Sequence, residues 1–346
     1  MTRADRVSRT ALSRRLGPIL ALSLCLVAAA LAWLGRQAQA PLALEAPDTL
    51  QILPGDTLAS VLDRLAAAGR LGHPLAIRAW ARLSGRGDRI IAGEYALPPG
   101  TTAARLLADF AAGRVRQHAV RVPEGVTFHD ALAALWASPV LTSTLRDRDD
   151  ADIMAALGAP GVAAEGWFLP DTYFVTRGQS DLDVLRRSHV AMQAQLDTLW
   201  QMRGPGAPAS TAEALTLASL IEKETARADE RPLIAAVLLN RLRLGMPLQI
   251  DSTVIYGLGT RFDGNLTRRD LLSPTPHNTY TQRGLPPTPI ALPSTASLKA
   301  AMNPAAVDYL YFVARGDGSH VFSRTLAEHN QAVDCYQRQL SQRCPS

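Results

Sequence analysis

The sequence lacks the patterns of several common enzyme classes. It contains no His-Glu-x-x-His, no Gly-x-Ser-x-Gly, no glycine-rich loop that ends in lysine, and no cysteine pairs at zinc-binding spacing. These absences argue against a zinc protease, a serine hydrolase with a nucleophile elbow and a nucleotide-binding enzyme with a P-loop. The seven histidines are scattered along the sequence, and His320 and His329 are the pair that could approach one another in space. Because isolated histidines are more often structural than ligands, we expect no metal and no other cofactor.

The charge distribution also lacks the features of a nucleic-acid-binding protein. The chain has 36 basic and 31 acidic residues, a formal net charge of +5. No basic block is interleaved with aromatic residues, and part of the excess is local, in five arginines before residue 16. Nucleic acid is therefore not an expected partner.

One long apolar run follows these arginines. Leu16 to Leu34 is 19 residues without a charged side chain, close to the roughly 20 residues that cross a hydrocarbon core. We predict a transmembrane helix over residues 16–36, with residues 1–15 kept in the cytoplasm by the arginines. A cleaved signal peptide is the alternative, because Ala38-Gln39-Ala40 resembles a cleavage site, but the run is long for one. Both interpretations place the rest of the chain outside the cytoplasm.

Cysteine is rare, with three residues in 346. Cys25 lies in the apolar run, whereas Cys335 and Cys344 lie near the C-terminus. In an oxidising compartment the last two could close a small disulfide-bonded loop. Two unpaired thiols are the alternative, and the sequence leaves the choice open.

A short unit occurs three times after a spacer at residues 37–49. In each copy a glycine permits a turn and a threonine can cap the amphipathic helix that follows. Short strands are expected at residues 50–53 and 118–122, so residues 50–122 are predicted to form a small α+β module. The three copies begin at Pro54-Gly55-Asp56-Thr57, Pro99-Gly100-Thr101-Thr102 and Glu124-Gly125-Val126-Thr127.

A connecting α+β region is predicted for residues 123–205. Its aromatic stretch from Glu165 to Tyr173 is interpreted as a core-forming turn, and a helix is expected from about Asp181 to Met202. Gly204-Pro205-Gly206-Ala207-Pro208 is the predicted domain boundary, because proline and glycine interrupt regular structure. Residues 206–346 then form a mixed α+β domain.

Helix signals open this last domain. Ser210 and Glu213 have the spacing of a capping box, and a second helix is expected to start near Pro232 and stop at Gly245. Beyond it the chain is rich in proline, hydroxyl and amide side chains. Long ordered loops of this composition are candidate walls of a groove for a polar ligand.

Glu224 is the residue that most suggests chemistry. It follows Leu220 by four residues and Ile221 by three, so it shares the apolar face of its helix. Burial there would raise its pKa and keep it protonated near neutrality, as a general acid requires. A structural salt bridge with an arginine such as Arg241 is the alternative.

Glu222 and Glu224 resemble the carboxylate pair of a glycosidase. Two residues of a regular helix turn through about 200°, so the two side chains should face opposite ways. Glu222 is expected to top the polar face of the helix or to hold a neighbouring loop. A single acid suits a mechanism in which the sugar's own 6-hydroxyl traps the oxocarbenium-like centre, with Glu224 acting as acid and then as base.

The segment from Leu217 to Thr225 resembles the endolytic murein transglycosylase family, also called YceG-like. The resemblance extends over roughly residues 50–338. It implies an inner-membrane anchor with a cytoplasmic N-terminus, a LysM-like module at residues 50–122 and a periplasmic catalytic domain at residues 206–346. The other supporting motifs are Asn240-Arg241-Leu242, Leu248 to Gly257, Asn278-Thr279-Tyr280 and Gly284-Leu285-Pro286-Pro287.

The same resemblance implies an activity and its partners. The enzyme would cleave nascent peptidoglycan strands between N-acetylmuramic acid and N-acetylglucosamine, leave 1,6-anhydro-N-acetylmuramic acid ends and so end strand elongation. Glycan strands would be the substrate and peptidoglycan synthases candidate partners. A muramidase with Asp251 as base and a non-catalytic cell-wall-binding scaffold are the alternatives.

The resemblance also implies roles for individual residues. Glu224, the glutamate followed by threonine, would be the catalytic residue, with Glu222 and Glu230 in support. His277 and Ser294 depart from the family's usual tyrosine and glycine, which puts fine substrate preference in doubt more than the reaction. The residues implied to line the groove are Gln249, Asp251, Thr253, Asn278 and Tyr280.

Overall fold

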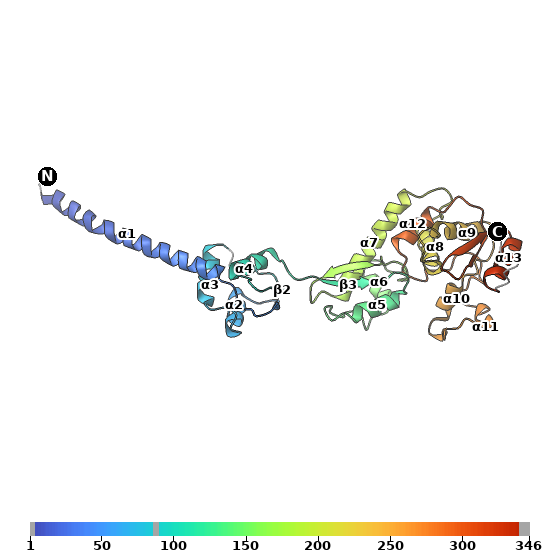
Figure 1. Ribbon diagram of the computed structural model, residues 1–346, viewed down its shortest axis with the longest axis horizontal. Coiled ribbons are helices and arrows are strands. Elements are labelled where there is room, and N and C mark those ends of the chain that lie inside the picture. Colours follow the sequence, from blue (N-terminus) through green and yellow to red (C-terminus); the bar gives the residue numbers. More distant parts are fainter. Residues whose placement is uncertain (1–3, 86–89, 339–346) are drawn as a thin grey trace. The chain divides into compact units, whose positions relative to one another are not determined.

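A computed structural model describes residues 4–85 and 90–338. The chain forms two compact units (Figure 1). The first contains the residues up to His118 together with Thr176–Gly178, and the second contains Ala119–Val175 and the residues from Gln179 onward. The fold is mixed α+β, as predicted, and the sheets of the described residues are all two-stranded.

The first unit begins with the long helix α1, Ala4–Gln39. Its 22-residue stretch Pro18–Gln39 is long and apolar enough to cross a membrane. Leu20 and Leu24 are 68% and 72% exposed, so this stretch presents bare apolar surface of the kind that lipid covers. The helix continues to Gln39 rather than ending at residue 36, because Ala38 is buried in the core of the first unit.

A two-stranded antiparallel sheet and three helices complete the first unit. Thr57 and Thr102 cap α2 and α4, as the sequence predicted, since each side chain accepts a hydrogen bond from the amide three residues later. Tyr95 packs edge-on against Phe110 in the core, with ring centroids 4.8 Å apart. The elements are β1 (Asp48–Ile52), α2 (Leu58–Ala67), α3 (Pro74–Leu83), β2 (Gly93–Leu97) and α4 (Ala103–Ala112), with β1 paired to β2.

The first part of the second unit holds the aromatic stretch that was interpreted as a core-forming turn. Phe168 is fully buried and stacks on Phe128, with ring centroids 4.9 Å apart, which confirms that interpretation. Gly166 has a φ of +85°, and a Cβ there would lie 2.5 Å from Pro289, so only glycine permits this approach. The elements are β3 (His118–Val122), α5 (Phe128–Trp136), α6 (Asp150–Ala156), β4 (Asp171–Val175) and α7 (Asp181–Gln201).

The rest of the second unit is built around α8, whose apolar residues are buried on several sides. Leu217, Leu220 and Ile221 are 0% exposed, and α8 packs against α9 and α12. The elements are α8 (Thr211–Glu224), α9 (Arg231–Arg243), α10 (Asp251–Leu258), the 3-10 helix η1 (Gly259–Arg261), α11 (Arg268–Leu271), α12 (Thr295–Met302), β5 (Tyr311–Ala314), β6 (His320–Ser323) and α13 (Leu326–Tyr336).

The predicted boundary at Gly204 to Pro208 joins α7 to α8 inside the second unit. Met192 and Leu196 of α7 belong to the same buried cluster as Leu217 of α8. Glycine and proline therefore mark a turn between two packed helices here. The extents of the LysM-like module and the catalytic domain stay predictions.

The predicted start of α8 and both predicted ends of α9 are confirmed, but the carboxylate half of the capping box bonds the amide before the N-cap residue. Ser210 accepts from the Glu213 amide (3.1 Å), while the Glu213 carboxylate accepts from the amide of Ala209 (3.0 Å). Pro232 lies in the first turn of α9, and Gly245, with a φ of +64°, follows its end.

The predicted disulfide stays a prediction. Cys335 is buried in α13, but its expected partner Cys344 lies outside the described residues.

Candidate active site

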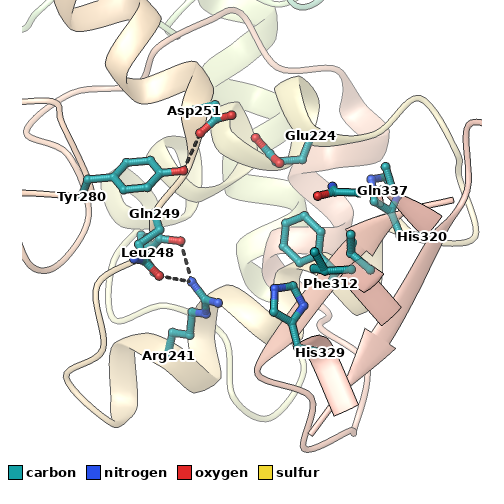
Figure 2. Close-up of a pocket in the computed structure, with 13 residues that line it drawn as sticks. Glu224, Arg241, Leu248, Gln249, Asp251, Tyr280, Phe312, His320, His329 and Gln337 are labelled. Carbon is teal, nitrogen blue, oxygen red and sulfur yellow. Dashed lines mark hydrogen bonds between the residues drawn. The ribbon is translucent and has the colours of Figure 1, made fainter. Parts of the chain in front are cut away.

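A pocket of about 440 Å³ opens beside the C-terminal end of α8 (Figure 2). One side, here called the loop wall, consists of Arg241, Leu248, Gln249, Asp251 and Tyr280. The opposite side, here called the hairpin wall, comes from β5, β6 and α13 and consists of Phe312, Val313, Ala314, His320, His329, Val333 and Gln337. Glu224 lies between the two walls.

Glu224 is the last residue of α8, because Thr225 is extended, with φ −149° and ψ 138°. Its side chain is partly exposed at the pocket and accepts a hydrogen bond from Ser252 Oγ at 3.3 Å. Burial, together with the negative charge of Asp251, raises the pKa of Glu224 to about 7, against the smaller lowering effects of Ser252 and His320. The raised pKa that helix geometry predicted is thus present.

Arg241 does not pair with Glu224. Its guanidinium donates to the carbonyls of Leu310 (2.6 Å) and Leu248 (2.9 Å) and lies 5.1 Å from the centre of the Tyr311 ring. Within the part of the chain that the structure describes, Glu224 has no ion-pair partner. The alternative of a structural Glu224–Arg241 salt bridge is therefore wrong.

Gln249 has the backbone conformation that shapes the loop wall. Among the described residues it is the one non-glycine residue with positive φ, +54°, a conformation that costs free energy for a residue with a Cβ. Its amide donates to the carbonyl of Thr279 (3.1 Å), and its Oε1 lies 3.5 Å from Nη1 of Arg241. These contacts hold the strained residue in the pocket lining.

Asp251 and Tyr280 meet across the loop wall. The Tyr280 hydroxyl donates to Oδ1 of Asp251 at 2.5 Å. Burial, reinforced by this hydrogen bond and by the charge of Asp251, raises the pKa of Tyr280 well above its ordinary value, so the phenol remains a donor. One carboxylate oxygen of Asp251 is left for a ligand.

Thr253 and Asn278, which were expected to line the groove, lie behind the loop wall. Both are 0% exposed. Thr253 Oγ1 donates to the Ile250 carbonyl (2.6 Å), and Asn278 Nδ2 donates to two loop carbonyls at 3.0 and 2.7 Å while its Oδ1 accepts from the Tyr280 amide. Because these polar atoms satisfy buried backbone groups, the two residues shape the wall from behind and do not contact the pocket.

Glu222 faces away from Glu224, as the helix geometry predicted. Its Oε2 accepts from the Ser294 amide (3.0 Å), the Ser294 hydroxyl (2.5 Å) and the Ser297 hydroxyl (2.6 Å). Arg231 lies 3.9 Å from its other oxygen. Glu222 therefore holds the N-terminus of α12, and Ser294, one of the two departures from the family pattern, is the N-cap residue of that helix.

His277, the other departure, lies outside the pocket lining. It hydrogen-bonds Thr288 Oγ1 at 2.8 Å and packs edge-on against Tyr256, with ring centroids 4.8 Å apart. The Tyr256 hydroxyl in turn donates to Glu165 (3.2 Å), which also accepts from the amide of Phe128 (3.0 Å). Burial raises the pKa of Glu165 to about 7. These contacts around Glu165, here called the Glu165 region, join α5 and α10.

The hairpin wall is what the sequence reasoning missed. His320 and His329 were interpreted as structural, yet both line the pocket. Glu230 lies behind His320 and is 5% exposed; it accepts from the His320 amide at 2.8 Å and pairs with its Nδ1 at 2.7 Å. Glu230 and His320 are 90 residues apart, so no local pattern could have connected them.

Three comparisons with known proteins bear on this site. A sequence model of the YceG-like family matches residues 50–335. An endolytic murein transglycosylase of Bacillus subtilis is 37% identical over 172 residues, which cover 50% of this chain and 48% of that protein. One from Streptococcus pneumoniae R6 is 31% identical over 174 residues, covering 49% of this chain and 31% of that protein. The matches thus span about half of the first relative and about a third of the second.

A crystal structure of a YceG-like protein from Listeria monocytogenes is also similar to this chain. It aligns with a TM-score of 0.49 and 26% sequence identity. The alignment covers 83% of this chain and 99% of that one.

Proposed function

The chain belongs to the YceG-like family, and from this premise we propose that it is an endolytic lytic transglycosylase of peptidoglycan. It is a lyase that cleaves nascent glycan strands between N-acetylmuramic acid and N-acetylglucosamine and leaves 1,6-anhydro-N-acetylmuramic acid ends. The observation that carries this proposal is the carboxyl of Glu224, whose pKa burial raises to about 7 where it meets a polar pocket. The relatives named as endolytic murein transglycosylases support the substrate class.

Glu224 supplies the proton in this mechanism. Its protonated carboxyl donates to the glycosidic oxygen as the bond from that oxygen to the anomeric carbon breaks, a contribution of typically about 10²–10⁴-fold. The 6-hydroxyl oxygen of the same muramic acid then bonds to the anomeric carbon, and the hydroxyl proton passes to the Glu224 carboxylate. Because burial disfavours the anion, the carboxylate readily takes this proton back. No water is consumed, and the enzyme returns to its starting state.

The loop wall supplies candidate substrate contacts. Gln249 presents a side-chain amide, Tyr280 a hydroxyl and Asp251 a carboxylate oxygen, groups that can hydrogen-bond sugar hydroxyls and acetamido groups. Thr253 and Asn278 support this wall from behind. Glu222 and Glu230 take supporting roles, through α12 and His320 respectively.

We also propose that α1 anchors the protein in the inner membrane by a single pass, with the N-terminus in the cytoplasm and the second unit in the periplasm. The apolar stretch Pro18–Gln39 and the arginines that precede it in the sequence support this orientation. The order β1-α2-α3-β2, with an antiparallel strand pair, supports assignment of the first unit as the LysM-like module. Peptidoglycan synthases are candidate partners.

The products of purified glycan strands test the activity. The wild-type protein should release fragments with 1,6-anhydro ends, one water lighter than hydrolytic products by mass spectrometry. Glu224→Gln should lower the rate by about 10²–10⁴-fold without lowering the melting temperature. Glu124→Gln, at an exposed position, should leave the rate unchanged.

Two other outcomes would replace this proposal. Reducing muramic acid ends would indicate a muramidase, for which Asp251 in the pocket lining is the candidate base. Sedimentation with sacculi without release of any fragment, by wild type and variant alike, would indicate a scaffold.

A further inference from the structure

The hairpin wall places an imidazole beside the proposed acid. His320 is the first residue of β6 and lines the pocket with Glu224. In Figure 2, Glu224 lies between Asp251 on one side and His320 and Gln337 on the other. The site therefore has an ionisable group on each side of Glu224, and the proton transfers proposed above use neither.

Glu230 fixes the orientation of the His320 ring. Burial alone would raise the pKa of Glu230, but hydrogen bonds from the His320 ring and amide outweigh it and lower that pKa. The ionised carboxylate can only accept, so the ring nitrogen 2.7 Å away, Nδ1, carries the hydrogen. Thr225 also donates to Glu230, at 3.2 Å, which ties the carboxylate to the residue that follows Glu224.

The other ring nitrogen of His320 is available to a ligand. No residue in the described ranges hydrogen-bonds Nε2, and Glu230, on the Nδ1 side, does not line the pocket. The ring is held edge-on to Phe312, with centroids 5.5 Å apart. In the neutral ring, hydrogen on Nδ1 leaves the lone pair on Nε2, and this neutral form is the one that can accept a hydrogen bond.

Glu224 has little acceptor capacity before the glycosidic bond breaks. One of its oxygens accepts from Ser252, and the other must carry the proton for the leaving oxygen. A protonated carboxyl in this state is poorly placed to hold the attacking hydroxyl as well. A separate acceptor would keep that hydroxyl at the anomeric carbon. Holding two reacting groups together in this way increases the reaction rate by large factors.

We propose that His320, oriented by Glu230, is a further catalytic residue whose Nε2 accepts a hydrogen bond from the attacking 6-hydroxyl of the substrate. The inference rests on the proposed transglycosylase function. The hydrogen bond holds O6 beside the anomeric carbon while Glu224 protonates the leaving oxygen. The O6–C1 bond then forms as the hydroxyl proton moves along this hydrogen bond to Nε2. The imidazolium passes its Nε2 proton to the Glu224 carboxylate, so both residues return to their starting states and no atom is gained or lost. Glu230 is a positioning residue in this arrangement.

Product partitioning distinguishes this role from a structural one. The experiment uses the full chain in detergent, acting on uncrosslinked glycan strands, with anhydro and reducing ends counted by mass spectrometry. His320→Ala should lower anhydro-end formation by about 100-fold, and the residual products should contain a larger fraction of reducing ends, because water replaces an unheld hydroxyl. Glu230→Gln should shift both quantities in the same direction by less.

The matched control is His129→Gln, an exposed histidine of α5 whose side chain is 71% exposed. It should leave both the rate and the product ratio unchanged. If His320→Ala lowers the melting temperature, His320→Gln, which keeps a polar side chain of similar length, provides the same comparison in a folded protein.

Two results would overturn the proposal. One is a His320 variant with the wild-type rate. The other is a folded His320 variant that is slow but still forms anhydro ends in the wild-type proportion, since that is what a binding or packing role produces. A wild-type protein that forms only reducing ends, or no product, would instead contradict the proposed function itself.

Discussion

Two regions of the second unit each hold a carboxyl whose pKa burial raises to about 7, and they differ in almost every other respect. Glu224 meets an open pocket and accepts one hydrogen bond, from a serine hydroxyl. Glu165 is 6% exposed and accepts from the Phe128 amide and the Tyr256 hydroxyl. The comparison shows that a raised pKa does not by itself identify a catalytic acid. Access to substrate and unused hydrogen-bonding capacity do.

The largest expected effect is on enzymatic activity, which should depend on Glu224 and not on Glu165. Glu224→Gln should lower anhydro-end formation by about 10²–10⁴-fold, because its proton is lost from the reaction. Glu165→Gln keeps an acceptor for Phe128 and Tyr256, so its activity should stay within a few-fold of wild type. Initial rates on glycan strands measure both. Equal losses of activity in the two folded variants would show that the Glu165 region takes part in the reaction.

The second effect is on stability and concerns both carboxyls. A carboxyl with a raised folded pKa binds its proton more tightly in the folded state, so its contribution is fully present below about 4.5 and is lost as pH rises through about 7. Each shift corresponds to roughly 3 kcal/mol. Urea unfolding at a series of pH values should show the free energy of unfolding falling over this range.

The variants sharpen that measurement. Glu165→Gln and Glu224→Gln should each flatten the slope, and the double variant should flatten it further. A single variant that leaves the slope of wild type would mean that its carboxyl titrates normally in the folded protein.

The third effect tests how tightly the residues next to Glu165 are packed. Gly166→Ala should destabilise the protein by about 2 kcal/mol more than Gly161→Ala, because it adds overpacking. Both glycines have positive φ, +85° and +80°, but only a Cβ at Gly166 meets another atom, Pro289 at 2.5 Å. Thermal and urea unfolding give the difference. Equal losses would indicate that Pro289 moves aside at no cost.

The smallest effect concerns the pH dependence of activity. Glu224 must be protonated to donate, so kcat should fall about tenfold per pH unit above about 7. The same limb should appear in Glu165→Gln, because that carboxyl is not in the pocket. A shift in the pH at which kcat begins to fall in Glu165→Gln would show that the charge of Glu165 influences Glu224.

Features set by neighbouring residues were the ones predictable from the sequence. The threonine caps at Thr57 and Thr102, the start of α9 at Pro232 and the opposite facing of Glu222 and Glu224 all follow from helix geometry over a few residues. Each depends on a turn or a cap whose partner lies in the same segment. The raised pKa of Glu224 followed from its place on the apolar face.

Features set by long-range packing were not predictable. Loop composition placed Thr253 and Asn278 in the groove, but their hydrogen bonds to buried carbonyls hold them behind it. The hairpin wall reaches the pocket only because β6 pairs with β5 and lies against the start of α9. A glycine- and proline-rich segment such as Gly204 to Pro208 looks alike whether it separates domains or joins two packed helices.

The hydrogen bonds of Glu222 affect how far the last turn of α8, which carries Glu224, can move. The last turn of a helix lacks some of its backbone hydrogen bonds and is where helices fray. Three hydrogen bonds from Ser294 and Ser297 to Glu222 grip that turn from the side opposite the pocket. They therefore narrow the range of positions that the Glu224 carboxyl samples before substrate binds. Removing these hydrogen bonds would widen that range more than it would shift the mean position.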